Sequence, residues 1–187
     1  MKERWREPMA MVQIRRGNAA DAAFVREVAE QVFGELGDYG RILPTWLVHD
    51  GVLTHVAEEA GLAVGYTMLG FYTAGPTRQH EYVADLLAIA VAPRAQGRGV
   101  GKQLLDHAIG QAALARRRMP VVELRLSVAE PNARARALFG KFGFDFVDGE
   151  HGRYDGGQRA LHILHLLLDA LRLLHQFSDA RHVCRLG

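Results

Sequence analysis

The chain has one cysteine among its 187 residues, Cys184, so it cannot form an internal disulfide and suits a reducing compartment. It contains no apolar run of about 18 residues, the length that a membrane-spanning helix requires. Its first residues lack the apolar segment of a secretory signal. The net charge of +2 gives no overall basic field of the kind that binds nucleic acid. We therefore expect a cytoplasmic protein that binds neither nucleic acid nor membrane.

The apolar pattern predicts alternating strands and helices in a single domain. Strands are expected over residues 12–16, 52–59, 63–73, 82–91, 121–128 and 144–148. Helices are expected from Asn18 or Asp21 to about Phe33, near the end of 36–47, from Val100 to about 116–118, and from Asn132 to Phe142. Composition leaves strand and helix both open for 159–167. This order predicts an α/β (α+β) fold, with a mixed sheet of about six to seven strands and about four flanking helices.

A glycine-rich loop, "PRAQGRGVGKQLL", follows the apolar strand expected over 82–91 and opens an amphipathic helix. It is not a Walker loop, because Gln96 replaces the first glycine and Gln103 replaces the hydroxyl residue that binds Mg²⁺. It is not a dinucleotide-binding fingerprint either, because Lys102 or Leu104 stands where the third glycine belongs.

The segment 96–101 instead has the pattern [QR]-x-x-G-x-[GA]. The first amides of a helix have no intrahelical partner and lie at the positive end of the helix dipole, where an anion binds. Gly99 and Gly101 carry no Cβ to obstruct a pyrophosphate. Arg98 and Lys102 add positive charge. The loop therefore predicts a diphosphate site.

The sequence resembles the GNAT superfamily of acyl-CoA N-acetyltransferases over residues 12–167. Three segments in order carry the resemblance: "ADLLAIAVAPRAQGRGVGKQLL", "LRLSVAEPNARARALFGKFGF" and "GRYDGGQRALHI". The nearest group is the ribosomal-protein-alanine N-acetyltransferases. Residues 1–11 would be an N-terminal extension, and 168–187 a leucine-rich tail.

The resemblance implies a site for acetyl-CoA, with no metal. The backbone of Ile89, Ala90 and Val91 would pair with the pantetheine arm. The pyrophosphate would lie on Gly97, Arg98, Gly99, Val100, Gly101 and Lys102. Asn132 occupies a position that contacts the cofactor in the family, although it is equally suited to be a helix N-cap.

The expected reaction is direct attack of a primary amine on the thioester. Amines are mostly protonated near neutral pH, so a base is useful. Many relatives carry a carboxylate six residues before the valine at this strand end, which is Asp85 here. The alternative role for Asp85 is a strand-end cap or ion pair. Tyr154 in "GRYDGGQ" matches a family tyrosine near the acceptor, which favours a peptide or protein N-terminal amine.

Two residues depart from the family pattern. Ser127 stands where the alanine acetyltransferases carry a glutamate, and a serine is no base at neutral pH. Phe139 replaces the tyrosine that serves as general acid, although a thiolate leaves tolerably without one. These departures keep a second hypothesis open, a non-catalytic acyl-CoA-binding sensor. A polyamine or antibiotic acetyltransferase is a third.

The C-terminal part of the sequence supports no metal site. His162 with His165, and His182 with Cys184, do not make a recognised four-ligand set. Leucines 164, 167, 168, 171 and 174 would share one face of a helix. A helix that packs on its own domain and a homodimer contact both remain open.

Overall fold

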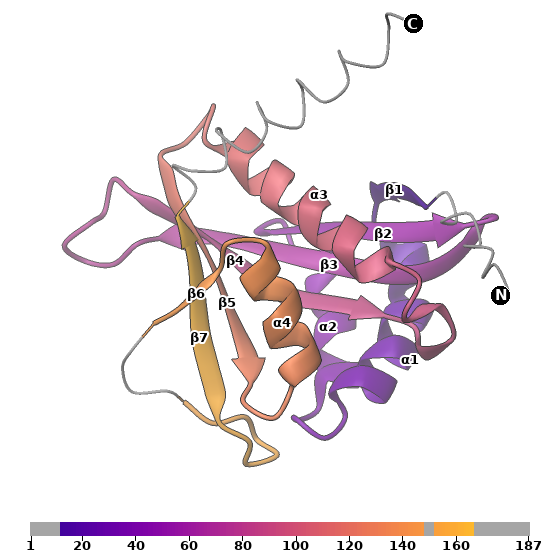
Figure 1. Cartoon of the computed structure of the whole chain (residues 1–187). Coiled ribbons are helices and arrows are strands. Elements are labelled where there is room, and N and C mark those ends of the chain that lie inside the picture. Colours follow the sequence, from indigo (N-terminus) through magenta and orange to yellow (C-terminus); the bar gives the residue numbers. More distant parts are fainter. Residues whose placement is uncertain (1–11, 148–151, 167–187) are drawn as a thin grey trace, which may run out of the picture.

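A computed structural model describes residues 12–147 and 152–166, which form one mixed sheet with helices on both faces (Figure 1). The strands are β1 (Gln13–Arg16), β2 (Val52–Glu59), β3 (Leu62–Thr73), β4 (Tyr82–Val91), β5 (Val121–Ala129), β6 (Asp145–Phe146) and β7 (Ala160–Leu166). The helices are α1 (Ala22–Phe33), α2 (Tyr39–Trp46), α3 (Val100–Ala115) and α4 (Ala133–Lys141). These seven strands and four α-helices of the described residues confirm the expected fold class.

Two details differ in extent from the sequence-based expectation. The segment left open over 159–167 contains a strand, β7, whereas the strand expected over 144–148 is only the two residues of β6. The N-terminal extension and the leucine-rich tail lie outside the described residues. The homodimer contact stays a prediction for the same reason.

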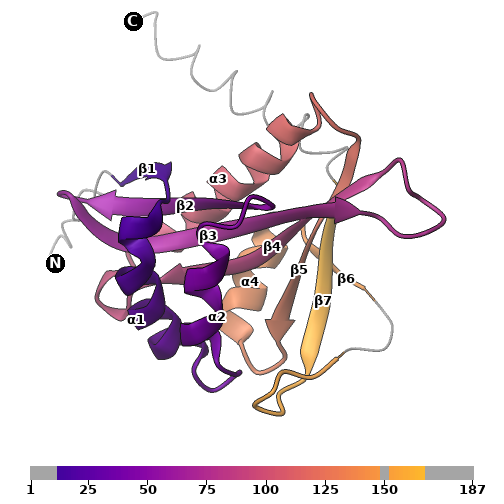
Figure 2. The ribbon, with the colours of Figure 1, turned by 180° about the vertical axis from the view of Figure 1, so that it is seen from behind.

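The strand order in the sheet is β1-β2-β3-β4-β5-β7-β6. Only β4 and β5 pair in parallel among the described strands, with α3 as the crossover between them. Helices α3 and α4 cover one face of the sheet, and α1 and α2 cover the other (Figures 1 and 2). β7 pairs with the edge of β5 that faces away from β4, so the end of the described chain lies next to the middle of the sheet.

The two central strands separate halfway along their length. Their paired register runs from Tyr82 opposite Val121 to Leu86 opposite Leu126, although both strands continue further. Figure 1 shows their carboxyl ends pointing in different directions. A bulge in β4 marks the same place, because Leu87 has no partner in the register with β3. The separation opens a cleft between the strands.

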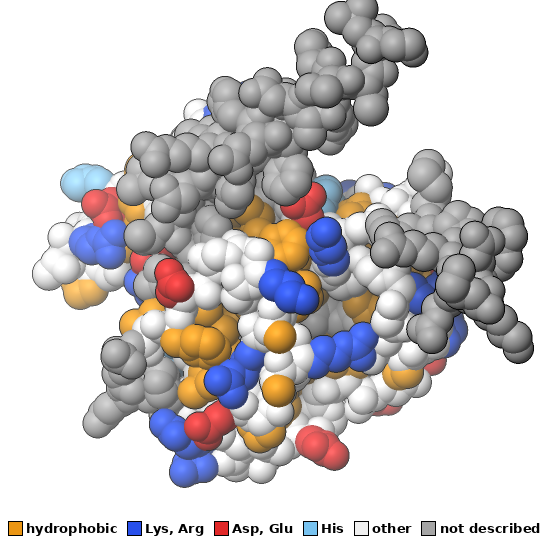
Figure 3. Space-filling model, viewed as in Figure 1, with side chains coloured by type: hydrophobic (Ala, Val, Ile, Leu, Met, Phe, Trp, Pro, Cys, Tyr) orange, Lys and Arg blue, Asp and Glu red, His pale blue; other side chains and the backbone are white. Residues whose placement is uncertain are grey.

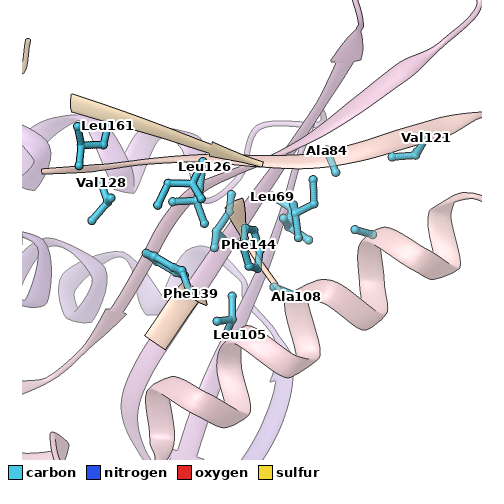
Figure 4. Close-up of a cluster of buried hydrophobic side chains, with 14 residues drawn as sticks. Leu69, Ala84, Leu105, Ala108, Val121, Leu126, Val128, Phe139, Phe144 and Leu161 are labelled. Carbon is cyan, nitrogen blue, oxygen red and sulfur yellow. The ribbon is translucent and has the colours of Figure 1, made fainter. Parts of the chain in front are cut away.

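Each helical layer has its own buried cluster. Leu105 and Ala108 of α3 and Phe139 of α4 pack on Leu86 and other side chains of the sheet (Figure 4). On the opposite face, residues of α1 and α2 pack on Tyr66, Met68 and Ala88. Leu86 and Ala88 are two apart yet face opposite layers, because the bulge at Leu87 reverses the alternation.

Candidate active site

The cleft between β4 and β5 draws its walls from both helical layers. It is lined by Val32, Phe33, Leu36, Tyr39, Leu86, Leu87, Ala88, Ile89, Leu126, Ser127, Val128, Ala129, Asn132, Ala135, Phe139 and Tyr154. Its walls combine the end of α1 and the start of α2 with the start of α4. A molecule in the cleft would therefore meet both faces of the sheet.

The edge of β4 beyond the bulge faces this cleft. Residues 89–91 pair with β3 on one side only, because β5 has already moved away. An unpaired strand edge is a template for an extended ligand that adds as a further strand. The carbonyl of Val91 accepts a hydrogen bond from Nε2 of Gln96 at 3.1 Å. Ile89 and Val91 are only partly buried, although they end an apolar strand.

The glycine loop has the backbone geometry that its sequence predicts. Gly97 and Gly99 have φ of 82° and 85°, in the left-handed region that favours glycine. Gly99 is the N-cap of α3, and the first hydrogen bond of the helix runs from Gln103 N to Gly99 O at 3.2 Å. The amides of Val100, Gly101 and Lys102 precede that bond. Apart from the adjacent residues, no atom in the described part of the chain lies within 4 Å of a Cβ built on either Gly97 or Gly99, so an anion has room to approach.

Basic side chains surround the loop, but they do not all point at it. Arg98 forms an ion pair with Glu59 at the end of β2, while Lys102 is exposed at the start of α3. Arg134 of α4 donates to Oε1 of Gln96 at 3.2 Å, which links α4 to the loop. Basic side chains on this face stand apart among neutral and apolar ones (Figure 3). The sequence analysis missed Arg134, which lies 38 residues from Gln96.

Asp85 lies on the sheet face that α1 and α2 cover, beside the cleft but not among its lining residues. The hydroxyl of Tyr72 on β3 donates to its Oδ2 at 3.1 Å. Burial raises the pKa of Asp85, while the Tyr72 hydrogen bond and the charges of Arg125 and His162 lower it by less. Arg125 itself pairs with the buried carboxylate of Glu123. A raised pKa makes Asp85 a better proton acceptor than an ordinary carboxylate.

Three residues that the family resemblance singled out also line the cleft, namely Ser127, Asn132 and Phe139. The side chain of Asn132 accepts from the amide of Ala135 at 3.0 Å, so Asn132 is an N-cap that also faces the cleft. Phe139 is buried against Phe144 with ring centroids 5.7 Å apart. The hydroxyl of Ser127 is exposed in the cleft. Phe139 has no group that could protonate a leaving thiolate.

Tyr154 belongs to a loop that docks against the segment between α1 and α2. Its ring centroid lies 6.5 Å from that of Tyr39, with 67° between the ring planes, and burial raises the pKa of Tyr154 to about 12. Gly156 N donates to Leu36 O at 3.1 Å, and Gln158 Nε2 donates to Glu35 O at 3.0 Å. These contacts place both loops beside the cleft. Sequence reasoning found Tyr154 but missed its partners on the 34–39 segment.

Two further properties of the described residues bear on the nature of the site. Across residues 12–147 and 152–166, no group of three or more histidine, cysteine, aspartate and glutamate side chains could hold a metal ion. Over the same ranges, no helix is long and apolar enough to cross a membrane.

Solved structures of acetyltransferases have the same fold. The ribosomal-protein-alanine N-acetyltransferase of Brucella melitensis is 25% identical, with a TM-score of 0.65 over 83% of this chain and 99% of that one. Arabidopsis thaliana NAA60 in complex with acetyl-CoA is 13% identical, with a TM-score of 0.70 over 84% and 99%. The ribosomal-protein-S18-alanine N-acetyltransferase of Escherichia coli is 20% identical, with a TM-score of 0.58 over 84% and 94%. No curated protein sequence matches the chain significantly.

The family comparison agrees with the architecture of the cleft. The model of the acetyltransferase (GNAT) family matches residues 21–144, well over half of the chain. The match spans the separated strands, the glycine loop and α4. The resemblance found in the sequence is therefore confirmed, and the protein belongs to the acetyltransferase (GNAT) family.

Proposed function

We propose that this acetyltransferase moves an acetyl group from acetyl-CoA to a primary amine at the end of a peptide or protein. The observation that carries the proposal is the cleft between β4 and β5, with the glycine-capped start of α3 at one end and Asp85 beside it. The single cysteine supports a reducing, cytoplasmic setting.

The glycine loop supports acetyl-CoA as the donor. The left-handed Gly97 and Gly99 present the amides of the loop to open space, which suits the diphosphate of the coenzyme. The unpaired edge of β4 at residues 89–91 suits the amide groups of the pantetheine arm. Two neighbours support the same assignment, because their structures hold acetyl-CoA.

The other end of the cleft supports a peptide amine as the acceptor. Tyr39, Tyr154 and the 34–38 segment border it on the α1 and α2 side, opposite α3 and α4. The Brucella neighbour, 25% identical, is named for acetylating an alanine of a ribosomal protein. Donor and acceptor would then meet from opposite faces of the sheet.

The proposed chemistry is direct transfer with no covalent enzyme intermediate. The amine nitrogen attacks the thioester carbon, the C–N bond forms, and the C–S bond breaks with its electron pair on sulfur. Asp85 accepts a proton from the incoming ammonium, directly or through water, and its raised pKa suits that role. The thiolate takes a proton from water, because Phe139 supplies none.

A thiol-release assay tests the reaction. The substrates are acetyl-CoA with a peptide that has a free N-terminus, and the same peptide with a blocked N-terminus and a free lysine. We expect turnover with the first only, and a fall in kcat of roughly 10²-fold for Asp85→Asn. Turnover that Asp85→Asn leaves unchanged would show that Asp85 is not the base.

Calorimetry tests the donor site. Gly99→Glu should abolish acetyl-CoA binding, because it puts a carboxylate where the diphosphate belongs. Gly61→Glu, at the β2–β3 turn with φ of 78° and open space around it, is the matched control for left-handed strain and should bind normally. Normal binding by Gly99→Glu would contradict the site. The buried Phe139 favours the non-catalytic sensor as the rival, which predicts tight acetyl-CoA binding without turnover of any amine.

A further inference from the structure

Ser127 and His162 form a hydrogen-bonded pair beside the cleft. They stand directly opposite each other in the register of β5 and β7, and Ser127 Oγ lies 3.0 Å from His162 Nδ1. Their strands place them on the same sheet face as Asp85, and the charge of His162 acts on the carboxylate of Asp85. The pair therefore joins a cleft residue to an imidazole that the proposed function does not use.

The other polar side chains of the cleft are poorly suited to accept a proton. Burial raises the pKa values of Tyr39 and Tyr154, so both hydroxyls stay protonated at neutral pH. The Asn132 side chain already accepts from Ala135 N and is no base. A lone serine hydroxyl is no base either, but an imidazole exchanges protons near neutrality. His162 gives Ser127 the proton acceptor that its own side chain lacks.

We propose that Ser127 accepts a proton from the reacting nitrogen and passes its own hydroxyl proton to Nδ1 of His162. This inference rests on the proposed function. An ammonium substrate loses one proton before attack and a second after the C–N bond forms. Asp85 takes the first, and the Ser127–His162 pair takes the second. The imidazolium then releases its proton to water, so that each turnover returns the pair to its starting state.

Charged side chains of neighbouring strands lie on the same sheet face as His162. Asp85 faces it from β4, and Arg125 faces it from β5 with its charge balanced by Glu123. Asp145 on β6 shares this sheet face by strand alternation. Asp85 on β4 and Asp145 on β6 thus lie on the two strands that flank β5 and β7.

The test compares His162→Gln, Ser127→Ala and their double variant by kcat, KM and pH profile. Each single change should lower kcat by roughly 10²-fold and remove the same limb of the pH profile. The double variant should lose little more, because the two residues act as a unit. Acetyl-CoA affinity should not change. His80→Gln, an exposed histidine of the loop before β4, is the control and should match the wild type.

Two results would overturn this inference and leave the proposed function standing. One is a kcat and pH profile of His162→Gln within twofold of an active wild type. The other is the same result for Ser127→Ala, which decides the matter if His162→Gln fails to bind acetyl-CoA. A wild type that turns over no amine would overturn the proposed function, and with it the role of the Ser127–His162 pair as proton acceptor.

Discussion

Asp85 is a carboxylate whose surroundings pull its pKa in two directions. Burial raises the pKa, while the hydroxyl of Tyr72 and the charge of Arg125 favour the ionised form. Burial, and then the nearby Asp85, in turn raise the pKa of Tyr72 to about 12, so the tyrosine stays a hydrogen-bond donor throughout the working range. The strength of Asp85 as a base therefore depends on one hydroxyl from the neighbouring strand.

Tyr72→Phe should move the acid limb of the activity profile to higher pH. The hydrogen bond at 3.1 Å stabilises the charged carboxylate, so its loss raises the pKa of Asp85 further. Since the base works only when ionised, activity is then lost at a higher pH as the solution is acidified. The measurement is kcat/KM between pH 5 and 9. Tyr82→Phe, at the start of β4, is the control, and an unmoved acid limb would separate Tyr72 from the reaction.

At the scale of elements, the acceptor end of the cleft depends on contact between two loops. The 152–159 segment approaches the carbonyls of Glu35 and Leu36 through Gly156 and Gln158. A Cβ added at Gly156 would lie 1.8 Å from Glu35 O, a backbone atom that cannot step aside. A glycine is therefore required for the loops to meet.

Gly156→Ala should weaken acceptor binding and spare the donor. We expect KM for the peptide to rise about tenfold, equivalent to about 1.4 kcal/mol, while the affinity for acetyl-CoA stays within twofold. Gly152→Ala, in the same loop, places its Cβ more than 4 Å from every other atom of the described residues apart from its chain neighbours, and should behave as wild type. Steady-state kinetics and calorimetry provide both values. Equal losses for the two substrates would mean that the loops support the whole cleft.

The sequence predicted the elements that local patterns encode. The glycine spacing of 97–101 and the period of α3 specify a loop and a helix over a few residues, and the structure has both. The meeting of Ser127 with His162, 35 residues apart, requires β7 to pair with β5, and no short pattern reports that order. The bulge at Leu87 lies hidden in a continuous apolar run. Long-range pairing, not propensity, sets these parts of the site.

At the scale of the whole molecule, the sheet and α3 are joined by two histidines, of which His55 is buried and His107 is partly buried. The rings of His55 on β2 and His107 on α3 lie 4.3 Å apart. His55 Nδ1 and His107 Nε2 are buried and, among the described residues, have no hydrogen-bond partner. Burial, and then the charges of His107 and Arg16, lower the pKa of His55 to about 4, and burial lowers the pKa of His107. The folded state therefore holds both rings neutral.

Acid should destabilise the fold through this pair. Each histidine has a lower pKa in the folded state than in the unfolded state. Its neutral ring therefore contributes fully to the free energy of unfolding above the unfolded pKa near 6.5, and for His55 this contribution is lost as the pH falls toward about 4. Over that window, His55 alone should cost about 1.4 kcal/mol of unfolding free energy per pH unit. Urea unfolding from pH 7.5 to 4.5 measures the slope. His55→Asn should reduce the slope of the unfolding free energy against pH, and His80→Gln should leave it unchanged. A slope for His55→Asn equal to that of the wild type would show that the pair does not titrate.

The odd residue in β4 has a consequence for how the sheet could change. Removing Leu87 would restore an unbroken ladder with β3, because Leu86 and Ala88 already pair with the adjacent residues Leu69 and Met68. Ala88 and Ala90 would stay opposite Met68 and Tyr66 on the α1 and α2 side, so neither buried cluster would exchange residues. What would be lost is the bend at the point where β4 leaves β5, so shortening the chain by one unit would narrow the cleft while both interiors kept their packing.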